Sequence, residues 1–375
     1  YDGAEQQVAR AHALRKQALE PMNRELGYSA NTLYMVLSAL GQTEKAGEAV
    51  AEAWKILSYH LPREHPHIAA IANNYSTWLT DKGDPLQAKA FLLQAIGSNQ
   101  AGGRHLPLMQ NYVNLGRLYL NLREPTSAVT CFTQAWQMAD TLLAAPDYQR
   151  ANIKDGLGAA SLQQERYQQA RQYFTEALQE KQELYKPGDA EIGQSHFNLG
   201  LVAQVLQDHK AAAASFGRAV NIREQALGQD HPKYADAVFS LGEVAWARGR
   251  SEEGLRHWKT ALHVYKNRFG LAHHHTMVTC LQLAKAYRQQ PDSLQYYLKL
   301  AWAGALGRSM PLNSFSEMDG QELQQLHPVV LDLASFHLEW LGEPGSNMDR
   351  HQEQQIFNSV YRWLPGFQSL YNQPG

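Results

Sequence analysis

An alanine recurs along the chain at intervals of 40 or 42 residues, and this repeat constrains the possible folds more than any other feature of the sequence. The seven alanines are Ala53, Ala95, Ala135, Ala177, Ala219, Ala261 and Ala301, and an apolar residue follows each of them. A period of about 20 to 50 residues is typical of proteins built from stacked copies of one supersecondary unit. We therefore expect an elongated array of seven units, each in contact only with its neighbours.

The residues around each alanine predict two helices per unit. Ala128, Phe132 and Ala135 are spaced by four and then three residues, which places them on one face of a helix. Gly116, twelve residues before Ala128, has a small counterpart in most units and belongs to a preceding helix, so the two backbones can approach closely. Polar segments containing Gly or Pro, such as 81–85, separate the helices, and no alternating apolar pattern indicates a strand. Each unit is predicted to be an antiparallel helical hairpin.

This order of small, apolar and aromatic residues resembles the tetratricopeptide repeat. The residues that carry the resemblance are Asn114, Leu115, Gly116, Tyr119, Ala128, Phe132 and Ala135 in one unit and Asn198, Leu199, Gly200, Ala212, Phe216 and Ala219 in another. The usual repeat has about 34 residues. The longer period here, with His65-Pro66 and His231-Pro232 opening units, looks like the kinesin-light-chain type. The pattern departs at Gly156, where neighbouring units carry Asn.

The resemblance covers roughly residues 28 to 305 and implies an all-α fold. That fold is a right-handed superhelical solenoid of about seven hairpins with capping helices at its N- and C-terminal ends. Residues 1–27 are expected to form an N-terminal capping helix or half-repeat, and 28–305 the solenoid. Residues 306–322 are expected to form an irregular loop, and 323–375 C-terminal capping helices, because terminal repeats must cover an apolar face.

Composition excludes several classes of partner. The 34 Lys and Arg residues nearly balance the 36 Asp and Glu residues, so the formal net charge of −2 offers no basic field for nucleic acid. No apolar run approaches the roughly 18 residues that a membrane-spanning helix needs, so we expect no membrane insertion.

Motifs for metal, cofactor or catalytic chemistry are not found. Cys131 and Cys280 are expected to be buried free thiols, since neither has the spacing of a disulfide framework or a metal site. His273, His274 and His275 are adjacent, and their side chains on a helix would diverge rather than converge on one ion, so we expect them at the start of a helix. The chain carries no phosphate-binding glycine loop and no hydrolase or metalloprotease signature. We therefore predict a protein that is not an enzyme and needs no cofactor.

The resemblance implies that the first helix of each hairpin lines a concave groove. The residue two before each small crossing residue would face that groove, and several of these residues are amides, which can both donate to and accept from a peptide backbone. The alternative is that the amides cap or bridge neighbouring helices. Arg117, Lys285 and Arg288 would bind a carboxylate, or else be solvated or paired within the solenoid. The candidate groove residues are Asn31, Asn73, Asn74, Asn114, Arg117, Asn152, Gln163, Gln194, Asn198, Gln204, Trp246, Lys285 and Arg288.

These observations predict a non-catalytic scaffold or adaptor that binds a peptide or protein segment in its groove, with self-association through the end repeats as a further route to assembly. The alternative is a regulatory or sensor module, in which binding of a ligand or signalling peptide changes the shape of the solenoid and so controls a partner. The compartment is expected to be the cytoplasm, or the periplasm if Tyr1 follows a removed signal peptide.

Overall fold

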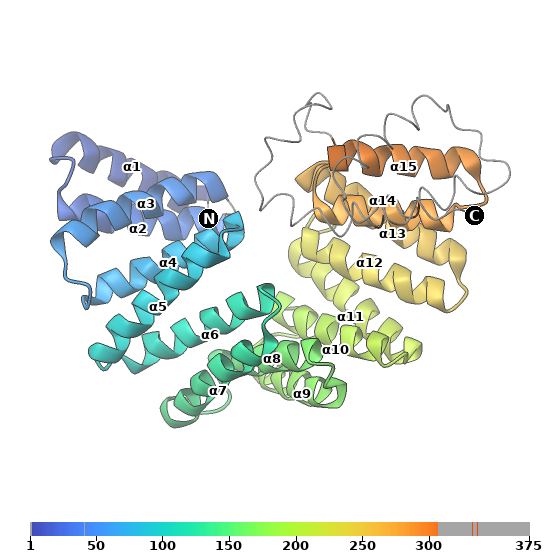
Figure 1. The fold of residues 1–375 in the computed structure, drawn as a ribbon, viewed down its shortest axis with the longest axis horizontal. Helices are drawn as coiled ribbons and strands as arrows, with labels where there is room; N and C mark the ends of the chain where they lie inside the picture. Colours follow the sequence, from blue (N-terminus) through green and yellow to red (C-terminus); the bar gives the residue numbers. More distant parts are fainter. Residues whose placement is uncertain (1, 41, 307–331, 333–335, 337–375) are drawn as a thin grey trace, which may run out of the picture. The chain divides into compact units, whose positions relative to one another are not determined.

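The computed structural model describes residues 2–40 and 42–306 together with Asp332 and Phe336. These residues form fifteen α-helices and no strand (Figure 1). The chain divides into two compact units, Tyr1–Lys186 and Pro187–Gly375. No helix among the described residues has the length and apolar character needed to cross a membrane. Nearly all of 307–375, where a loop and capping helices were expected, lies outside the described residues.

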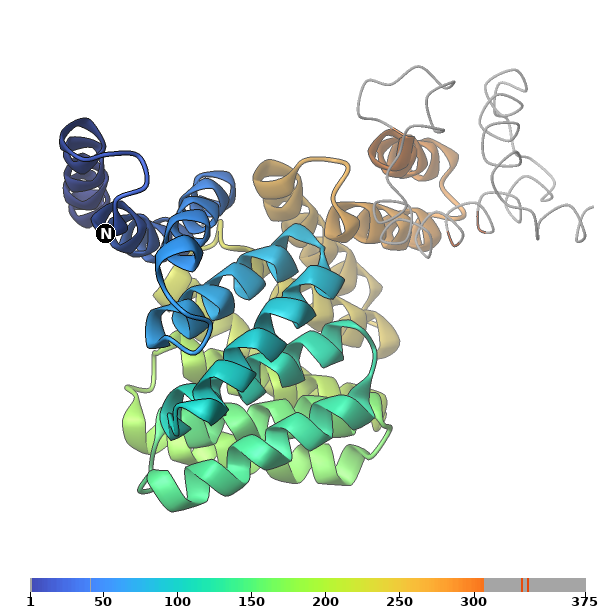
Figure 2. The same ribbon diagram turned by 60° about the vertical axis from the view of Figure 1, so that its left-hand side comes forward.

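The first unit holds one leading helix and four helical hairpins. The leading helix is α1 (Asp2–Ala18), which packs against α2. The hairpins are α2 (Arg24–Ala39) with α3 (Thr43–His60), α4 (Pro66–Lys82) with α5 (Pro85–Ala101), α6 (His105–Asn121) with α7 (Pro125–Leu142), and α8 (Tyr148–Gln163) with α9 (Tyr167–Leu184). The second helix of each of the first three hairpins packs on the first helix of the next, so the hairpins are stacked in sequence (Figure 2).

The second unit holds three hairpins. They are α10 (Ala190–Val205) with α11 (His209–Leu227), α12 (Pro232–Ala247) with α13 (Ser251–Phe269), and α14 (His274–Ala286) with α15 (Pro291–Leu306). Within this unit α11 packs on α12 and α13 packs on α14, which repeats the stacking of the first unit. The described residues thus contain seven hairpins in sequence, and the prediction of an all-α array of helical hairpins is confirmed.

Histidines begin three of the first helices. The backbone N–H groups of His67, Lys233 and His275 donate to the Nδ1 atoms of the histidine two residues earlier, at 3.1 to 3.3 Å. Burial lowers the pKa of these N-capping histidines, and neighbouring cationic groups lower it further, so their rings are neutral and Nδ1 is free to accept. The capping residues are His65, His231 and His273. The expected place of His273 at a helix start is confirmed.

In four of the hairpins an aromatic ring fills the space that a glycine leaves on the first helix. A Cβ atom built on Gly116 would lie 2.8 Å from Cζ of Phe132, which is fully buried. Gly158, Gly200 and Gly242 face the ring at the matching position of their own hairpin in the same way. The small residues therefore admit a ring as well as bringing two backbones together. Burying such a ring contributes on the order of 2 kcal/mol or more to each hairpin.

Gly156 has a packing role that explains its departure from the repeat pattern. A Cβ on Gly156 would overlap atoms of the Phe132 ring, so this ring is enclosed between Gly116 of its own hairpin and Gly156 of the next. An Asn at position 156, as in neighbouring units, would collide with the ring. The absence of an amide at this position is therefore compatible with the local packing of the Phe132 ring.

Both cysteines are buried free thiols, as predicted. Burial raises the pKa of Cys131 to about 11 and that of Cys280 to about 12. The two thiols are therefore protonated at neutral pH and act as small apolar residues of the core.

Replacing Gly156 with Asn is expected to destabilise the protein by about 1 to 3 kcal/mol, because the new side chain overpacks the Phe132 ring. The matched control is Gly97→Ala, at an exposed helical position where a new Cβ would meet no atom within 4 Å. The free energy of unfolding of this control should be unchanged or higher than that of the wild type by about 0.5 to 1 kcal/mol. Urea unfolding followed by circular dichroism measures both, and equal midpoints for the two variants would contradict this account of the packing.

Candidate binding surfaces

Four of the predicted groove residues lie together in the first unit, beside a pocket between α4, α5 and α6. We call it the amide pocket; its volume is about 380 Å³. The residues that line it are Pro66, His67, Ala69, Ala70, Asn73, Asn74, Asn99, Arg104, Pro107, Gln110 and Asn111. Asn31 and Asn114 are hydrogen-bonded to these lining residues. The helices α4 and α6 are in direct contact, so side chains from consecutive first helices meet here.

The amides of the pocket are linked across helices. Asn111 Nδ2 and Asn114 Nδ2 of α6 both donate to Asn73 Oδ1 of α4, at 2.9 and 2.8 Å. Asn74 Nδ2 of α4 donates to Asn31 Oδ1 of α2 at 2.9 Å. These residues therefore bridge neighbouring helices, which was the alternative left open by the sequence. The bridges hold the side chains in fixed orientations around the pocket.

Three residues of this network were not among the sequence candidates. Asn99 Nδ2 donates to Asn111 Oδ1 at 2.7 Å, and Arg104 Nε donates to Asn99 Oδ1 at 2.8 Å. Both asparagines are buried, with Asn99 2% and Asn111 3% exposed. Asn99 lies on a second helix and Asn111 at a core position of a first helix, so a search restricted to the groove-facing register of first helices passes over both.

A signal for such residues does exist in the repeat. The position four residues after the repeating alanine carries Asn99, Lys181, Arg223 and Tyr265 in four of the units, and each is buried and hydrogen-bonded. A polar residue recurring within an otherwise apolar helix face must find a partner, because an unpaired buried polar group costs about 1 to 3 kcal/mol. Aligning the units on their alanines would have exposed this position.

In the second unit, Gln194 and Asn198 are tied to one of these buried groups. Gln194 Nε2 donates to Asn198 Oδ1 at 2.8 Å, and Arg223 Nη2 donates to Gln194 Oε1 at 2.8 Å. Arg223 is 2% exposed, donates to the carbonyl of Lys233, and lies over the ring of Phe197 at 4.5 Å. Burial lowers the pKa of Arg223 to about 10. Gln194 thus serves to satisfy a buried guanidinium.

A second pocket, which we call the tryptophan pocket, lies within the second unit. Its volume is about 270 Å³, and it is lined by Glu243, Trp246, Trp258, Gln282, Lys285 and Ala286 from α12, α13 and α14. Trp246 and Lys285 were predicted groove residues. The predicted Gln204 donates from Nε2 to Glu243 Oε2 at 3.2 Å, and the predicted Arg288 lies 5.7 Å from the ring of Phe336. Glu243 itself was not singled out, because its position in the repeat shows no acidic pattern.

Besides Gln194 and Asn198, three more predicted residues belong to neither pocket. Arg117 is exposed, and Asn152 is half-buried; neither makes a hydrogen bond or ion pair within the described part of the chain. Gln163 Nε2 donates to the backbone carbonyl of Leu120 at 3.0 Å.

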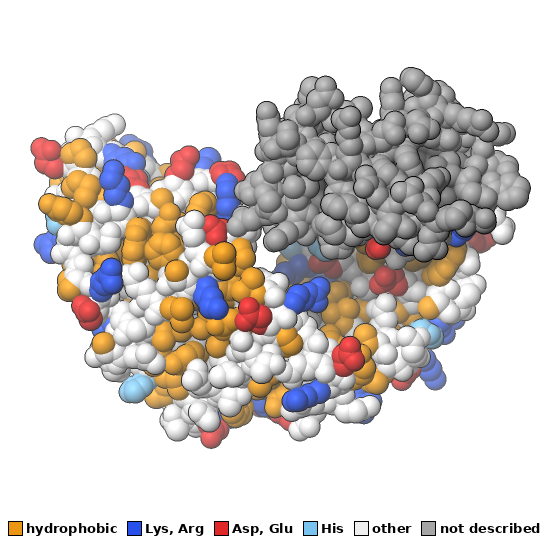
Figure 3. Space-filling view, in the orientation of Figure 1, with side chains coloured by type: hydrophobic (Ala, Val, Ile, Leu, Met, Phe, Trp, Pro, Cys, Tyr) orange, Lys and Arg blue, Asp and Glu red, His pale blue; other side chains and the backbone are white. Residues whose placement is uncertain are grey.

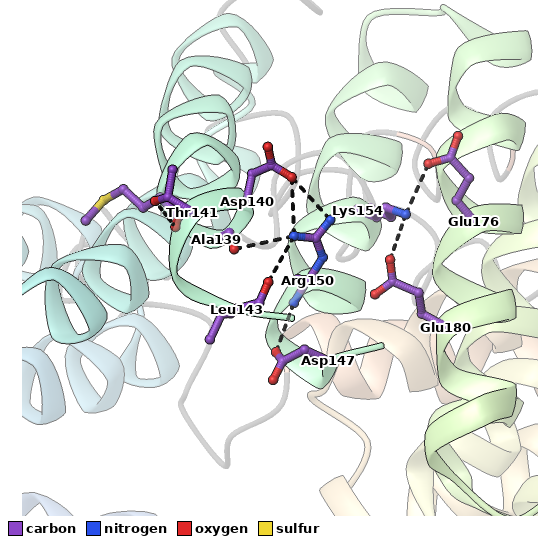
Figure 4. Close-up of polar contacts among 10 residues, drawn as sticks. Ala139, Asp140, Thr141, Leu143, Asp147, Arg150, Lys154, Glu176 and Glu180 are labelled. Atoms are coloured by element: carbon purple, nitrogen blue, oxygen red, sulfur yellow. Dashed lines mark hydrogen bonds and ion pairs between the residues drawn. The ribbon is translucent and has the colours of Figure 1, made fainter. Parts of the chain in front are cut away.

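Charged side chains on α8 form hydrogen bonds and ion pairs within the protein. Figure 4 shows Arg150 directed at Asp140 and at the carbonyls of Ala139 and Leu143, all at 3.4 Å. It also shows Lys154 between Glu176 and Glu180, at 3.3 and 2.8 Å. These contacts link α8 to α7 and α9. Elsewhere, on the described part of the face seen in Figure 3, basic side chains are scattered among acidic ones and form no patch of a single sign.

Comparison with known sequences identifies the repeat. Sequence models of the tetratricopeptide repeat match residues 110–141, 149–225 and 191–253. The chain is therefore a tetratricopeptide repeat protein. A search of curated proteins found no match.

Several solved structures share the fold at low identity. A Rap protein complexed with Competence and Sporulation Factor matches with a TM-score of 0.61 at 13% identity, over 95% of this chain and 94% of that one. BtubC from P. vanneervenii matches with a TM-score of 0.50 at 22% identity, over 62% of this chain and 93% of that one. Kinesin-light-chain-like repeats of Podosopora anserina match with a TM-score of 0.45 at 17% identity, over 52% and 93%.

Replacing Asn73 with Ala is expected to lower the free energy of unfolding by about 1 to 3 kcal/mol, because the buried Asn111 loses its acceptor. The control is Asn152→Ala, which removes no hydrogen bond to a described residue and should stay within about 0.5 kcal/mol of the wild type. Calorimetric unfolding of the two variants measures the difference. An Asn73→Ala variant as stable as the control would show that the amide bridges contribute nothing to the fold.

Proposed function

We propose that this protein is a non-catalytic interaction module whose first unit binds an extended segment of a partner protein in the amide pocket, through the partner's backbone. The observation that carries the proposal is the set of amide groups that line one pocket and keep unused hydrogen-bonding atoms. Tetratricopeptide repeats generally bind proteins, and the amide pocket is where this chain offers the chemistry for it.

Three polar atoms support recognition of a backbone. Asn73 Nδ2, Asn74 Oδ1 and Gln110 Oε1 belong to residues that line the pocket, and these atoms have no hydrogen-bond partner among the described residues. Together they offer one donor group and two acceptors. An extended peptide presents an N–H and a C=O at almost every residue, so it can satisfy such a set whatever its side chains are.

The charge of the pocket favours the same ligand. Arg104 is the one arginine or lysine among the lining residues. Its guanidinium already donates to Asn99 Oδ1, to the carbonyls of Glu64 and Ser98, and to Ser98 Oγ. Apart from His67 and the Nη1 group of Arg104, the polar side chains left for a ligand are neutral amides, which suit peptide groups.

Preorganisation adds to the argument. The bridges between Asn31 and Asn74, and from Asn111 and Asn114 to Asn73, fix these amides before any ligand arrives. Binding then costs less side-chain entropy, since each free side chain that must be ordered costs about 0.5 to 1.5 kcal/mol. The volume of about 380 Å³ lies in the range of ligand pockets and suits a short stretch of chain. A similarly folded Rap protein was solved in complex with Competence and Sporulation Factor, in keeping with ligand binding by such a fold.

The proposal is tested by selecting binders from a random peptide library displayed on phage, followed by synthesis of the best binder with single backbone N-methyl groups. N-methylation at the contacting residues should weaken binding by about tenfold or more, because it removes backbone N–H donors. Replacing single side chains of the peptide by Ala should lower the affinity less than backbone N-methylation does.

The matched variants are Gln110→Ala, which removes an unused acceptor of the pocket, and Asn152→Ala, which lies outside it. Gln110→Ala should lower the affinity for the selected peptide by about tenfold, and Asn152→Ala should leave that affinity unchanged. Equal binding by both variants, or no peptide enriched above background, would rule out the amide pocket as the binding site.

A further inference from the structure

The tryptophan pocket contains a carboxylate and an ammonium group that do not pair with each other. Glu243 of α12 and Lys285 of α14 both line the pocket. The hydrogen bond that Glu243 makes to a described residue comes from Gln204 Nε2 at 3.2 Å. The Lys285 ammonium lies 6.0 Å from the centre of the Phe336 ring. Opposite charges that share a small pocket without pairing leave both available to a ligand that carries the complementary pair.

Glu243 is placed to receive a cation. Burial raises its pKa, and the hydrogen bond from Gln204 is what opposes that shift. Glu243 forms no ion pair with a cationic side chain among the described residues. A positive group brought by a ligand would supply the missing interaction.

The two indole rings complete that side of the pocket. The rings of Trp246 and Trp258 lie 5.4 Å apart, and Trp246 is 36% exposed while Trp258 is 3% exposed. The exposed face of an indole attracts a cation held within about 6 Å. Glu243 and Trp246 are three residues apart on α12, so the carboxylate and the indole lie on the same side of that helix.

Two donors remain for a negative group. Trp258 Nε1 is buried and has no acceptor among the described residues. Leaving such a donor unpaired costs about 1 to 3 kcal/mol. Lys285 is exposed and makes no ion pair within the described part of the chain; the Phe336 ring lies beside its ammonium group. An anionic oxygen placed in this pocket would satisfy both groups.

We propose that the tryptophan pocket binds a small zwitterion of the α-amino acid class. The ammonium group of the ligand pairs with Glu243 beside the Trp246 ring, and its carboxylate accepts from Lys285 Nζ and Trp258 Nε1. The volume of about 270 Å³ lies just below the usual range for drug-sized ligands, which limits the occupant to a small molecule. This site lies in the second unit and goes beyond the proposed peptide site of the first.

Isothermal titration calorimetry of the full chain against each of the twenty amino acids tests the site. At least one should bind saturably with a stoichiometry of one, and its N-acetylated and C-amidated forms should each bind at least about tenfold more weakly. A peptide ending in the same residue has no charged α-nitrogen there and should behave like the acetylated form, which separates a free amino acid from a peptide terminus. If no amino acid binds at millimolar concentration, ordered water fills the pocket and the proposal is wrong.

Two variants locate the binding. Glu243→Gln and Lys285→Gln should each lower the affinity for the tightest-binding amino acid by about tenfold or more. The controls Glu252→Gln and Lys299→Gln, at exposed positions, should bind it as the wild type does. Glu243→Gln keeps the size of the side chain and an acceptor for Gln204, and it removes a charge that burial disfavours. Its melting temperature should therefore match or exceed that of the wild type, which separates lost binding from unfolding. Unchanged affinity in both pocket variants would overturn the assignment.

Discussion

Four of the seven described hairpins depend on one contact, in which an aromatic ring of the second helix fills the space left by a glycine of the first. Phe132, Phe174, Phe216 and Trp258 make this contact with glycines of their own hairpins. Because the ring is fully enclosed, the two helices have one way to lie against each other, and the same geometry is repeated along the array. The positions of the polar side chains on the first helices follow from that geometry.

The amides of the first unit lie where consecutive first helices come together. In the first unit, the first helices approach closely enough for Asn31, Asn73, Asn74 and Asn114 to join across hairpins. At Gly156 the Phe132 ring takes the space of the amide, so the run of linked amides stops at α8. Charged contacts of Arg150 and Lys154 follow there instead.

Much of the fold could be predicted from the sequence, because the period recurs in every unit and the small and aromatic residues recur in most of them. The amide pocket was predicted in part, since Asn31, Asn73, Asn74 and Asn114 lie in the register of the first helices. Asn99 and Arg104 were missed because they enter the pocket from a second helix and its following turn. The contact of Phe336 with Lys285 and Arg288 joins residues far apart outside the repeat period, so periodicity carries no information about it.

We propose that the fold arranges polar side chains in fixed positions and leaves some of their atoms for a ligand. The most direct measurement is NMR of the side-chain NH₂ groups of asparagine and glutamine, recorded while a library-selected peptide is added. The account predicts that the signals of Asn73, Asn74 and Gln110 shift in a saturable way while those of Asn152 do not move. Saturable shifts confined to residues outside the amide pocket would contradict it.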